Sequence, residues 1–400
     1  MVSMQSTERR HSTKKWVAPV AILLILMTVC GAILIFNFNG DPSSPQREFY
    51  VGVEIAYGDY SDFTAVVDEV KDYTNLVVFG LPEMTKNQTL LNMTCDYAYN
   101  AGLHFIVLLT NTSQYADWVG YTPAEWVTSA MQKYGDKFLA VYRWDEPGGD
   151  QLDNSKYQEV KSAANYTDAA NQYVNVLREH VDYYKNVGAP VVTADYCFYW
   201  FDYKVGYDAV FAEFGWNNSR EQQIAQVRGA ARANDKDWGA IVTWDYGNYT
   251  GSPFIESGPK LYNDLLLAYN NGAKYAVVFD YPQIPTAKYG ILGQEHLDAL
   301  KQFWTYINQN APTNADYKSV KTAYVLPTDY AFGFRNPTDS VWGLWRGDAT
   351  SQKIYSDVEN LIAQHGAGFD IVCDYTNLMA DAKDRYILLI FWNGTQVGRL

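Results

Sequence analysis

The sequence predicts an α/β protein built on a (β/α)8 barrel, with one transmembrane helix before the barrel and a small α/β domain after it. Eight short apolar runs rich in β-forming residues alternate with longer amphipathic stretches, as repeated β-α units do. These units occupy residues 49–311, close to the roughly 250 residues that are typical of such a barrel. A charge-free apolar run near the N-terminus predicts the transmembrane helix.

The apolar run covers residues 16–36, about the ~20 residues that a helix needs to cross a bilayer core. The tail before it, residues 1–15, carries Arg9, Arg10, Lys14 and Lys15, whereas residues 37–44 carry only Asp41. This charge asymmetry predicts a single-pass protein of the cell membrane, with its N-terminus in the cytoplasm and its C-terminal part outside. A cleaved signal peptide is the alternative, although its apolar region is usually only about 7–15 residues long.

The barrel is expected after a linker, residues 37–48. Its predicted strands are 50–55, 76–81, 105–109, 138–142, 191–194, 209–214, 240–243 and 275–279. Its predicted helices are 63–73, 88–99, 123–134, 166–186, 220–232, 258–271 and 295–309. The first five strands are almost continuously apolar, as expected of parallel strands that are covered on both faces.

A second break, with the linker 312–319, separates the barrel from residues 320–400. Strands are predicted there at 320–326, 369–373 and 386–391, and a helix at 352–364, with an aromatic segment at 341–345. At about 80 residues we expect a small α/β domain that could be incomplete.

Charge and composition narrow the class of partner. The net charge of −14 argues against nucleic acid, because little positive charge is left to neutralise phosphates. The chain contains 33 tyrosines and 12 tryptophans, whose flat apolar faces with a polar edge suit sugar rings. A preference for tyrosine in a stable exported protein would explain the same numbers. We expect a polysaccharide or glycan as partner.

Two further patterns concern export and cross-linking. N-x-S/T sequons, which are acceptors for glycosylation outside the cytoplasm, begin at Asn87, Asn92, Asn111, Asn165, Asn217, Asn248 and Asn393. Cys30 lies in the apolar run, which leaves Cys95, Cys197 and Cys373 without a CxxC spacing. The sequence therefore predicts neither a disulfide framework nor a zinc site.

Carboxylates follow most of the predicted strands. Because the active site of a barrel enzyme lies at the C-terminal ends of its strands, we expect these groups to converge. They are Glu54, Asp145, Glu146, Asp195, Glu213, Asp245 and Asp280. Tyrosines and tryptophans accompany them, at Tyr57, Trp144, Tyr196, Trp200, Trp216, Trp244, Tyr246 and Tyr281. Four of the acids also have a structural explanation. Asp145 could pair with Arg143 or cap the next helix, Glu54 could pair with a neighbouring cation, Asp280 could fix a turn, and Glu146 could be purely structural.

Paired carboxylates and aromatic platforms are what hydrolysis of a glycosidic bond requires, because one acid protonates the leaving oxygen while a second carboxylate attacks or activates water. The run Arg143-Trp144-Asp145-Glu146-Pro147 resembles the Asn-Glu-Pro signature of clan A glycoside hydrolases. The resemblance implies that Glu146 is the acid/base. Asp145 departs from the family pattern, which has an asparagine that contacts the sugar.

The same resemblance implies a nucleophile at the end of strand seven. The family has a glutamate there, and this chain has Trp244-Asp245-Tyr246, so Asp245 is the corresponding candidate. Its shorter side chain leaves both direct attack and water activation open. Glu213 is the other candidate for the second carboxylate. By pattern alone, residues 320–400 are similar to the α/β domain that follows the barrel in some β-galactosidase-like hydrolases.

Sequence motifs for other kinds of chemistry are missing. The histidines are scattered without HExxH, so we expect no metal. GxGxxG after a strand, a Walker loop and GxSxG are also missing, so we expect no nucleotide cofactor and no hydrolase elbow.

The leading hypothesis is a membrane-anchored, extracytoplasmic glycoside hydrolase. The main alternative is a carbohydrate-binding or cell-envelope protein that keeps the barrel without catalysis. A structural or adhesive surface component is a third hypothesis.

Overall fold

A computed structural model of the chain describes residues 48–56, 58–80, 82–109, 120–215, 218–244, 256–280, 292–310 and 320–398. The predicted transmembrane run lies outside these ranges, and within them no helix is both long and apolar enough to span a bilayer. Several candidate residues also lie outside them, namely Tyr57, Trp216, Asp245, Tyr246, Tyr281, Asn111, Asn217 and Asn248.

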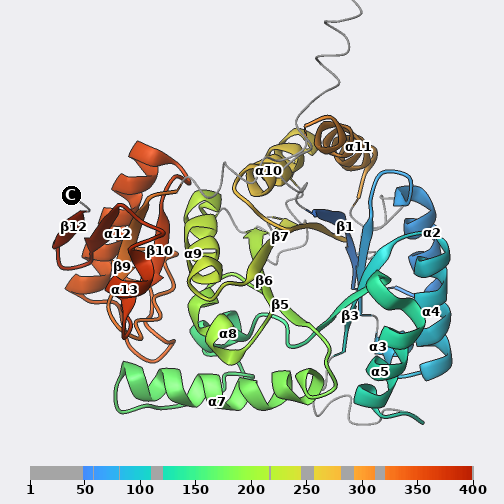
Figure 1. Cartoon of the computed structure of the whole chain (residues 1–400), viewed down its shortest axis with the longest axis horizontal. Helices are drawn as coiled ribbons and strands as arrows, with labels where there is room; N and C mark the ends of the chain where they lie inside the picture. Colours follow the sequence, from blue (N-terminus) through green and yellow to red (C-terminus); the bar gives the residue numbers. More distant parts are fainter. Residues whose placement is uncertain are drawn as a thin grey trace, which may run out of the picture. The chain divides into compact units, whose positions relative to one another are not determined.

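The eight predicted strands form a closed parallel barrel, which confirms the predicted (β/α)8 barrel. The strands are β1 (Tyr50–Ile55), β2 (Leu76–Phe79), β3 (His104–Leu108), β4 (Phe138–Tyr142), β5 (Val191–Asp195), β6 (Ala209–Gly215), β7 (Asp237–Trp244) and β8 (Tyr275–Asp280). The barrel closes where β8 pairs with β1, with Val53 opposite Val278. Figure 1 shows the strands at the centre, with helices around them.

The seven helices predicted between the strands are present. They are α2 (Tyr60–Val70), α4 (Gln88–Asn100), α5 (Pro123–Tyr134), α7 (Tyr166–Lys185), α9 (Arg220–Ala233), α10 (Gly258–Asn270) and α11 (Gln294–Gln309). Helix α2 begins three residues earlier than predicted, because Asp59 and Asp62 form a capping box ahead of its first apolar residue. Within the described part of the barrel, the sequence analysis missed the short helices α3 (Pro82–Thr85), α6 (Pro147–Leu152) and α8 (Tyr199–Val205).

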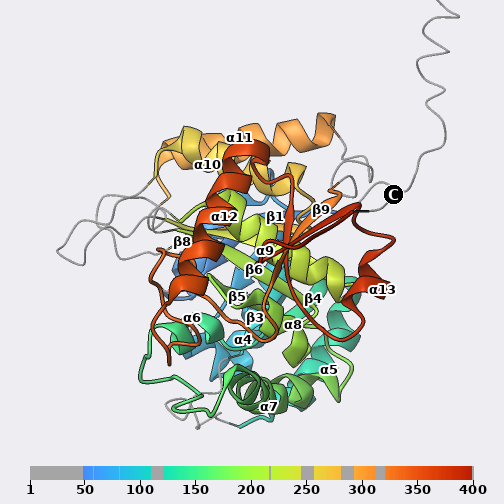
Figure 2. The ribbon, with the colours of Figure 1, turned by 90° about the vertical axis from the view of Figure 1, so that its left-hand side faces the viewer.

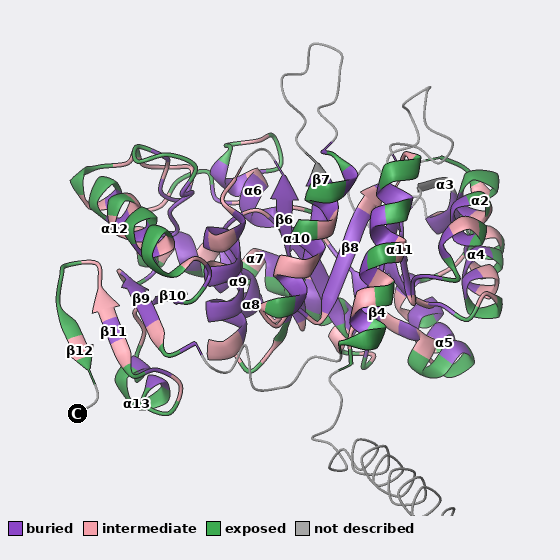
Figure 3. Cartoon of the chain, turned by 90° about the horizontal axis from the view of Figure 1, so that it is seen from above, coloured by how far each residue is buried: buried purple, intermediate pink, exposed green. Residues whose placement is uncertain are grey.

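Side chains of the strands divide between two apolar layers according to their two-residue period. One set fills the barrel interior and includes Tyr50, Ile106, Tyr142 and Phe211. The alternate set packs against the surrounding helices and continues into the larger core. Figure 3 shows the strands as the most buried part of the chain.

The C-terminal segment contains a four-stranded sheet with the order β10-β9-β11-β12. Its elements are β9 (Thr322–Leu326), α12 (Ala349–His365), β10 (Asp370–Cys373), α13 (Leu378–Ala382), β11 (Leu388–Phe391) and β12 (Gln396–Gly398). The aromatic segment 341–345 forms isolated bridges instead of a strand, and its Trp342 is fully buried.

This segment packs on helix α9 of the barrel, within one compact unit that covers Arg47–Leu400. Gly229 on α9 allows the close approach, because a Cβ there would lie 2.3 Å from the backbone oxygen of Ile371. Arg228 of α9 forms a fully buried ion pair with Asp370, with a distance of 2.7 Å between Nε and Oδ1. Figure 2 shows α12 in front of α9.

Candidate active site

The predicted acids divide into two groups by the direction in which their strand positions face. Glu54 and Glu213 follow the interior period of their strands, which places them with Tyr50 and Phe211 inside the C-terminal end of the barrel. Both side chains are buried. Asp195 and Asp280 occupy the alternate positions, which face the helices.

Glu146 and Glu213 form the centre of the site, because the charge of Glu146 acts directly on the buried carboxyl group of Glu213. Burial, followed by the negative charge of Asp145, raises the pKa of Glu146 to about 7, and the hydrogen bond from Glu213 opposes this shift. Burial and the charge of Glu146 raise the pKa of Glu213 well above its ordinary value. Because burial and the interaction with Glu146 raise the pKa of Glu213, Glu213 stays protonated when Glu146 loses its proton.

A strained turn holds Glu146 at the end of β4. Trp144 and Glu146 both have left-handed backbone angles, with φ values of 62° and 50°. Non-glycine residues adopt this conformation at a cost, and such strain is concentrated at functional sites. The amide of Glu146 is fixed by the carbonyl of Ala194 on β5, at 3.0 Å. The turn therefore presents Glu146 in one defined position.

Asp145 and Glu54 extend this group of carboxyls. The hydroxyl of Tyr142 donates a hydrogen bond to Asp145. The side chain of Asp145 is exposed, yet the protein packed around its carboxyl group raises its pKa, and the Tyr142 hydroxyl opposes that shift. Burial, then the charges of Asp145 and Glu146, raise the pKa of Glu54 well above its ordinary value.

Asp195 has a structural role that differs from the expected contact with a ligand. Its side chain is fully buried and accepts hydrogen bonds from the backbone amides of Gly148, Gly149, Tyr196 and Cys197. Asp195 therefore fixes the start of α6, directly after Glu146, because its strand position faces outward. Asp280 accepts from the amide of Leu292 at 3.4 Å and is also buried between strand and helices.

The aromatic candidates have different surroundings. Trp144 is half-buried, with the guanidinium of Arg143 5.4 Å from its ring centroid, and the ring of His180 beside it. Tyr196 is half-buried, and its hydroxyl donates to Asp153 at 2.7 Å. The backbone of Trp244 ends β7, and its side chain lies outside the described part of the structure.

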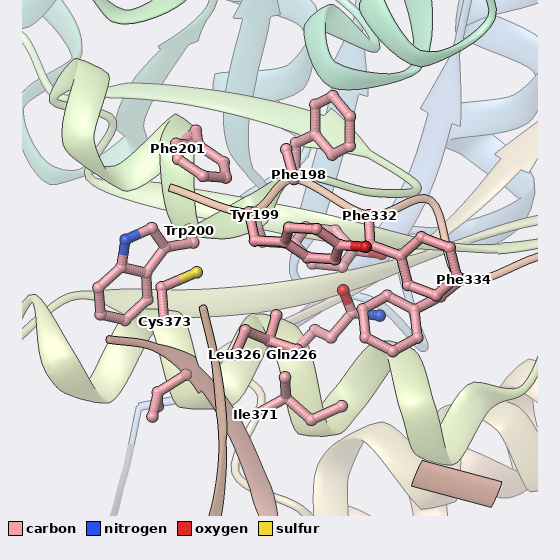
Figure 4. A pocket seen from close by; sticks show the side chains of 13 residues that line it. Phe198, Tyr199, Trp200, Phe201, Gln226, Leu326, Phe332, Phe334, Ile371 and Cys373 are labelled. Carbon is pink, nitrogen blue, oxygen red and sulfur yellow. The ribbon is translucent and has the colours of Figure 1, made fainter. Parts of the chain in front are cut away.

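Trp200 was expected to contact a ligand and instead packs in the core. It lies on α8 against Tyr375, with ring centroids 5.4 Å apart. Figure 4 shows it beside Cys373, near Leu326 of the C-terminal sheet, at a narrow cavity of about 20 Å³. No local sequence pattern indicates that the C-terminal segment packs against this helix.

Two polar residues of the site were missed by the sequence analysis. Tyr142 ends β4 on its interior side, and the two-residue period from Ala140 could have identified it. Gln223 on α9 donates from Nε2 to the backbone oxygen of Glu213 at 2.5 Å. No local sequence pattern marks Gln223, because its contact depends on how α9 packs against β6.

The remaining sequence candidates concern metals, cysteines and glycosylation. Among the described residues, no three His, Cys, Asp or Glu side chains are grouped as metal ligands, and Cys95, Cys197 and Cys373 are buried and unpaired. Of the described sequons, Asn87, Asn165 and Asn393 are exposed, whereas Asn92 is half-buried and accepts a hydrogen bond from Trp126.

No protein-family model matches the chain, and no curated protein matches it. Solved structures share the barrel at low similarity. A structure of pneumococcal StrH, concerned with N-glycan recognition and hydrolysis, is 9% identical with a TM-score of 0.42, covering 84% of this chain and 98% of that chain. Pseudomonas stutzeri endoglucanase Cel5A is 12% identical with a TM-score of 0.37, covering 64% and 93%.

Barrels with other chemistries match about equally well. The YdjI aldolase from Escherichia coli is 13% identical with a TM-score of 0.33, covering 68% of this chain and 93% of that chain. Similarity at this level does not separate hydrolases from aldolases, so the function must be argued from the carboxyl groups themselves.

Proposed function

We propose that this protein hydrolyses a glycosidic bond, with Glu146 as the proton donor. The observation that carries the proposal is the pair of electrostatically interacting carboxyl groups of Glu146 and Glu213 at the C-terminal end of the barrel. A pKa of about 7 keeps a large fraction of Glu146 protonated near neutral pH, as a general acid requires. The strained turn at Trp144 and Glu146 fixes the direction of the donor.

In this proposal Glu146 transfers its proton to the glycosidic oxygen as the bond to the anomeric carbon breaks. Glu213 donates a hydrogen bond to the carboxylate that remains on Glu146, and so stabilises its charge. The aromatic face of Trp144, half-buried beside Glu146, provides a surface for the sugar ring.

The attacking group must be a different carboxylate from Glu213. Carboxyl groups are about 5–5.5 Å apart in retaining hydrolases and about 6.5–9.5 Å apart in inverting ones. Burial and the charge of Glu146 raise the pKa of Glu213 well above its ordinary value, and a protonated carboxyl group can neither attack nor take a proton from water. The proposal therefore assigns attack, or activation of water, to Asp245, the candidate after β7.

The test compares the native protein with Glu146→Gln and Asp245→Asn on a panel of aryl glycosides with good and poor leaving groups. Loss of the acid should slow hydrolysis of the poor leaving groups about 10²–10⁴-fold and spare the activated ones. Loss of the attacking carboxylate should slow both. Equal turnover of poor leaving groups by native protein and Glu146→Gln would exclude Glu146 as the acid.

The raised pKa of Glu213 also favours a second candidate, a carbohydrate-binding protein without catalysis, because a carboxyl group that keeps its proton beside Glu146 cannot serve as the second catalytic carboxylate. Binding of an oligosaccharide without any release of product, at a sensitivity that detects very slow turnover, would decide for it.

We further propose that residues 16–36 anchor the protein in the cell membrane with the barrel outside. The length of the apolar run and the four basic residues before it support this placement. Digestion of intact cells with a non-permeant protease should remove the barrel and leave the N-terminal tail protected. Protection of the barrel would overturn the placement.

A further inference from the structure

A second polar cavity, of about 230 Å³, lies between the C-terminal rim of the barrel and the C-terminal segment. On the barrel side it is lined by Tyr196 after β5 and by Ser219, Gln222 and Gln223 at the start of α9. On the other side, Phe334 and Arg335 line it together with Tyr355 and Glu359 of α12.

Two residues that line this cavity, Gln223 and Tyr196, also interact with Glu213 or Glu146. Gln223 donates to the backbone oxygen of Glu213 at 2.5 Å. The pKa of the Tyr196 hydroxyl is raised chiefly by burial and also, in smaller part, by the charge of Glu146. The cavity therefore lies next to the proposed site of bond cleavage.

The lining suits an uncharged, hydroxyl-rich ligand. Ser219, Gln222 and Gln223 contribute uncharged polar side chains to the lining, which suit the hydroxyl groups of a sugar. Tyr355 and Phe334 add aromatic surface of the kind that packs against sugar rings.

The positive charge of Arg335, which lines the cavity, is already neutralised by neighbouring carboxylates. Arg335 forms ion pairs with Asp153 and with Asp339, the latter with 2.9 Å between NH2 and Oδ1. Glu359 adds a negative charge at the wall. An anionic ligand would therefore meet no free positive charge here, which favours a neutral sugar.

We propose that this cavity is a binding subsite for a neutral sugar unit adjacent to the bond that is cleaved, so that the protein acts on an oligosaccharide chain. The proposal rests on the proposed hydrolytic function. The volume, below the ~300–1,000 Å³ of sites for drug-sized ligands, fits one sugar ring rather than a chain. The C-terminal segment then has a direct role in substrate choice.

The first experiment uses the full-length chain and compares kcat/KM for a 4-nitrophenyl monoglycoside with kcat/KM for an oligosaccharide of the same sugar. Tyr355→Ala and, separately, Glu359→Ala should lower the oligosaccharide value about tenfold and leave the monoglycoside value unchanged. Tyr183→Ala, which removes an exposed tyrosine of α7 that does not line the cavity, is the matched control. If both cavity variants keep the native kcat/KM for the oligosaccharide as well as for the monoglycoside, the subsite proposal is wrong.

The second experiment separates this proposal from the hydrolytic one. If the native chain cleaves none of the substrates, the hydrolytic function fails, and the subsite is tested by binding alone on an array of neutral and anionic oligosaccharides. Neutral chains should bind, and Tyr355→Ala should weaken their Kd about tenfold while Tyr183→Ala does not. No binding of neutral chains, or a preference for anionic ones, would overturn the subsite. Melting curves of each variant test whether it is folded.

Discussion

Glu54 is a buried acid inside the barrel that costs stability when it ionises. Burial and the charge of Asp145 raise its pKa in the folded protein above the value in the unfolded chain. A group of this kind contributes stability that is fully present below the unfolded pKa and is lost as pH rises through the folded pKa. The free energy of unfolding should therefore fall as the pH rises above about 4.5, the ordinary value for glutamate.

Glu54→Gln should remove this loss. We expect the variant to be more stable than the native protein at pH ~8 and to differ little at pH ~4, because the amide has no charged form that burial would disfavour. Denaturant unfolding at both pH values measures the effect. Glu179→Gln, at an exposed acid of α7, is the control. A variant that is less stable than the native protein at both pH values would show that ionised Glu54 has a favourable partner.

At the scale of elements, the pair Gly148 and Gly149 allows the turn after β4 to lie against β5. A Cβ on Gly149 would lie 2.2 Å from the ring of Tyr196, and one on Gly148 would lie 2.7 Å from Oδ2 of Asp195. Real side chains do not approach this closely, so a larger residue must displace the turn that carries Glu146.

Gly149→Ala should therefore destabilise the protein by about 1–3 kcal/mol and lower kcat/KM, because overpacking shifts α6 and the proton donor together. Gly398→Ala, where nothing lies within 4 Å of the added Cβ, should change neither quantity. Unfolding curves and kinetics of both variants measure the difference. If Gly149→Ala is destabilised but keeps the native kcat/KM, the position of α6 does not affect catalysis and the prediction is wrong.

The strands were well predicted because each is a continuous apolar run, and β1 and β4 have the predicted bounds. The sequence analysis predicted less well whether each acid at a strand end faces the barrel interior or the surrounding helices. The sequence analysis grouped Asp195 with Glu54 and Glu213, although the two-residue period places Asp195 on the outer face. Helix α8 was missed because a helix of 7 residues is too short to show an apolar period.

At the scale of the whole molecule, a buried ion pair ties the C-terminal segment to the barrel. Asp370 is fully buried and binds both Arg228, at 2.7 Å, and Arg232, at 2.5 Å. Arg228 also donates to the carbonyls of Ala367 and Phe369. This contact joins residues more than a hundred positions apart, so no local pattern in the sequence could indicate it.

Asp370→Ala should destabilise the chain by about 3–5 kcal/mol, because it leaves two arginines at a buried interface without their shared partner. Asp68→Ala removes a surface ion pair between Asp68, whose side chain is 54% exposed, and Lys71. This change should lower the free energy of unfolding by no more than about 1 kcal/mol. Thermal unfolding of both variants measures the contrast. Similar small losses in the two variants would contradict the view that this ion pair holds the segment in place.

The central claim is that Glu146 delivers the proton, and the pH dependence of kcat/KM on an unactivated glycoside tests it most directly. The value should fall as the pH rises through about 7, the pKa of Glu146, because the donor loses its proton. In Glu146→Gln, measured on an activated aryl glycoside, this falling limb should be missing. A native profile that stays flat through pH 7, or a limb that persists unchanged in Glu146→Gln, would contradict the assignment of Glu146 as the acid.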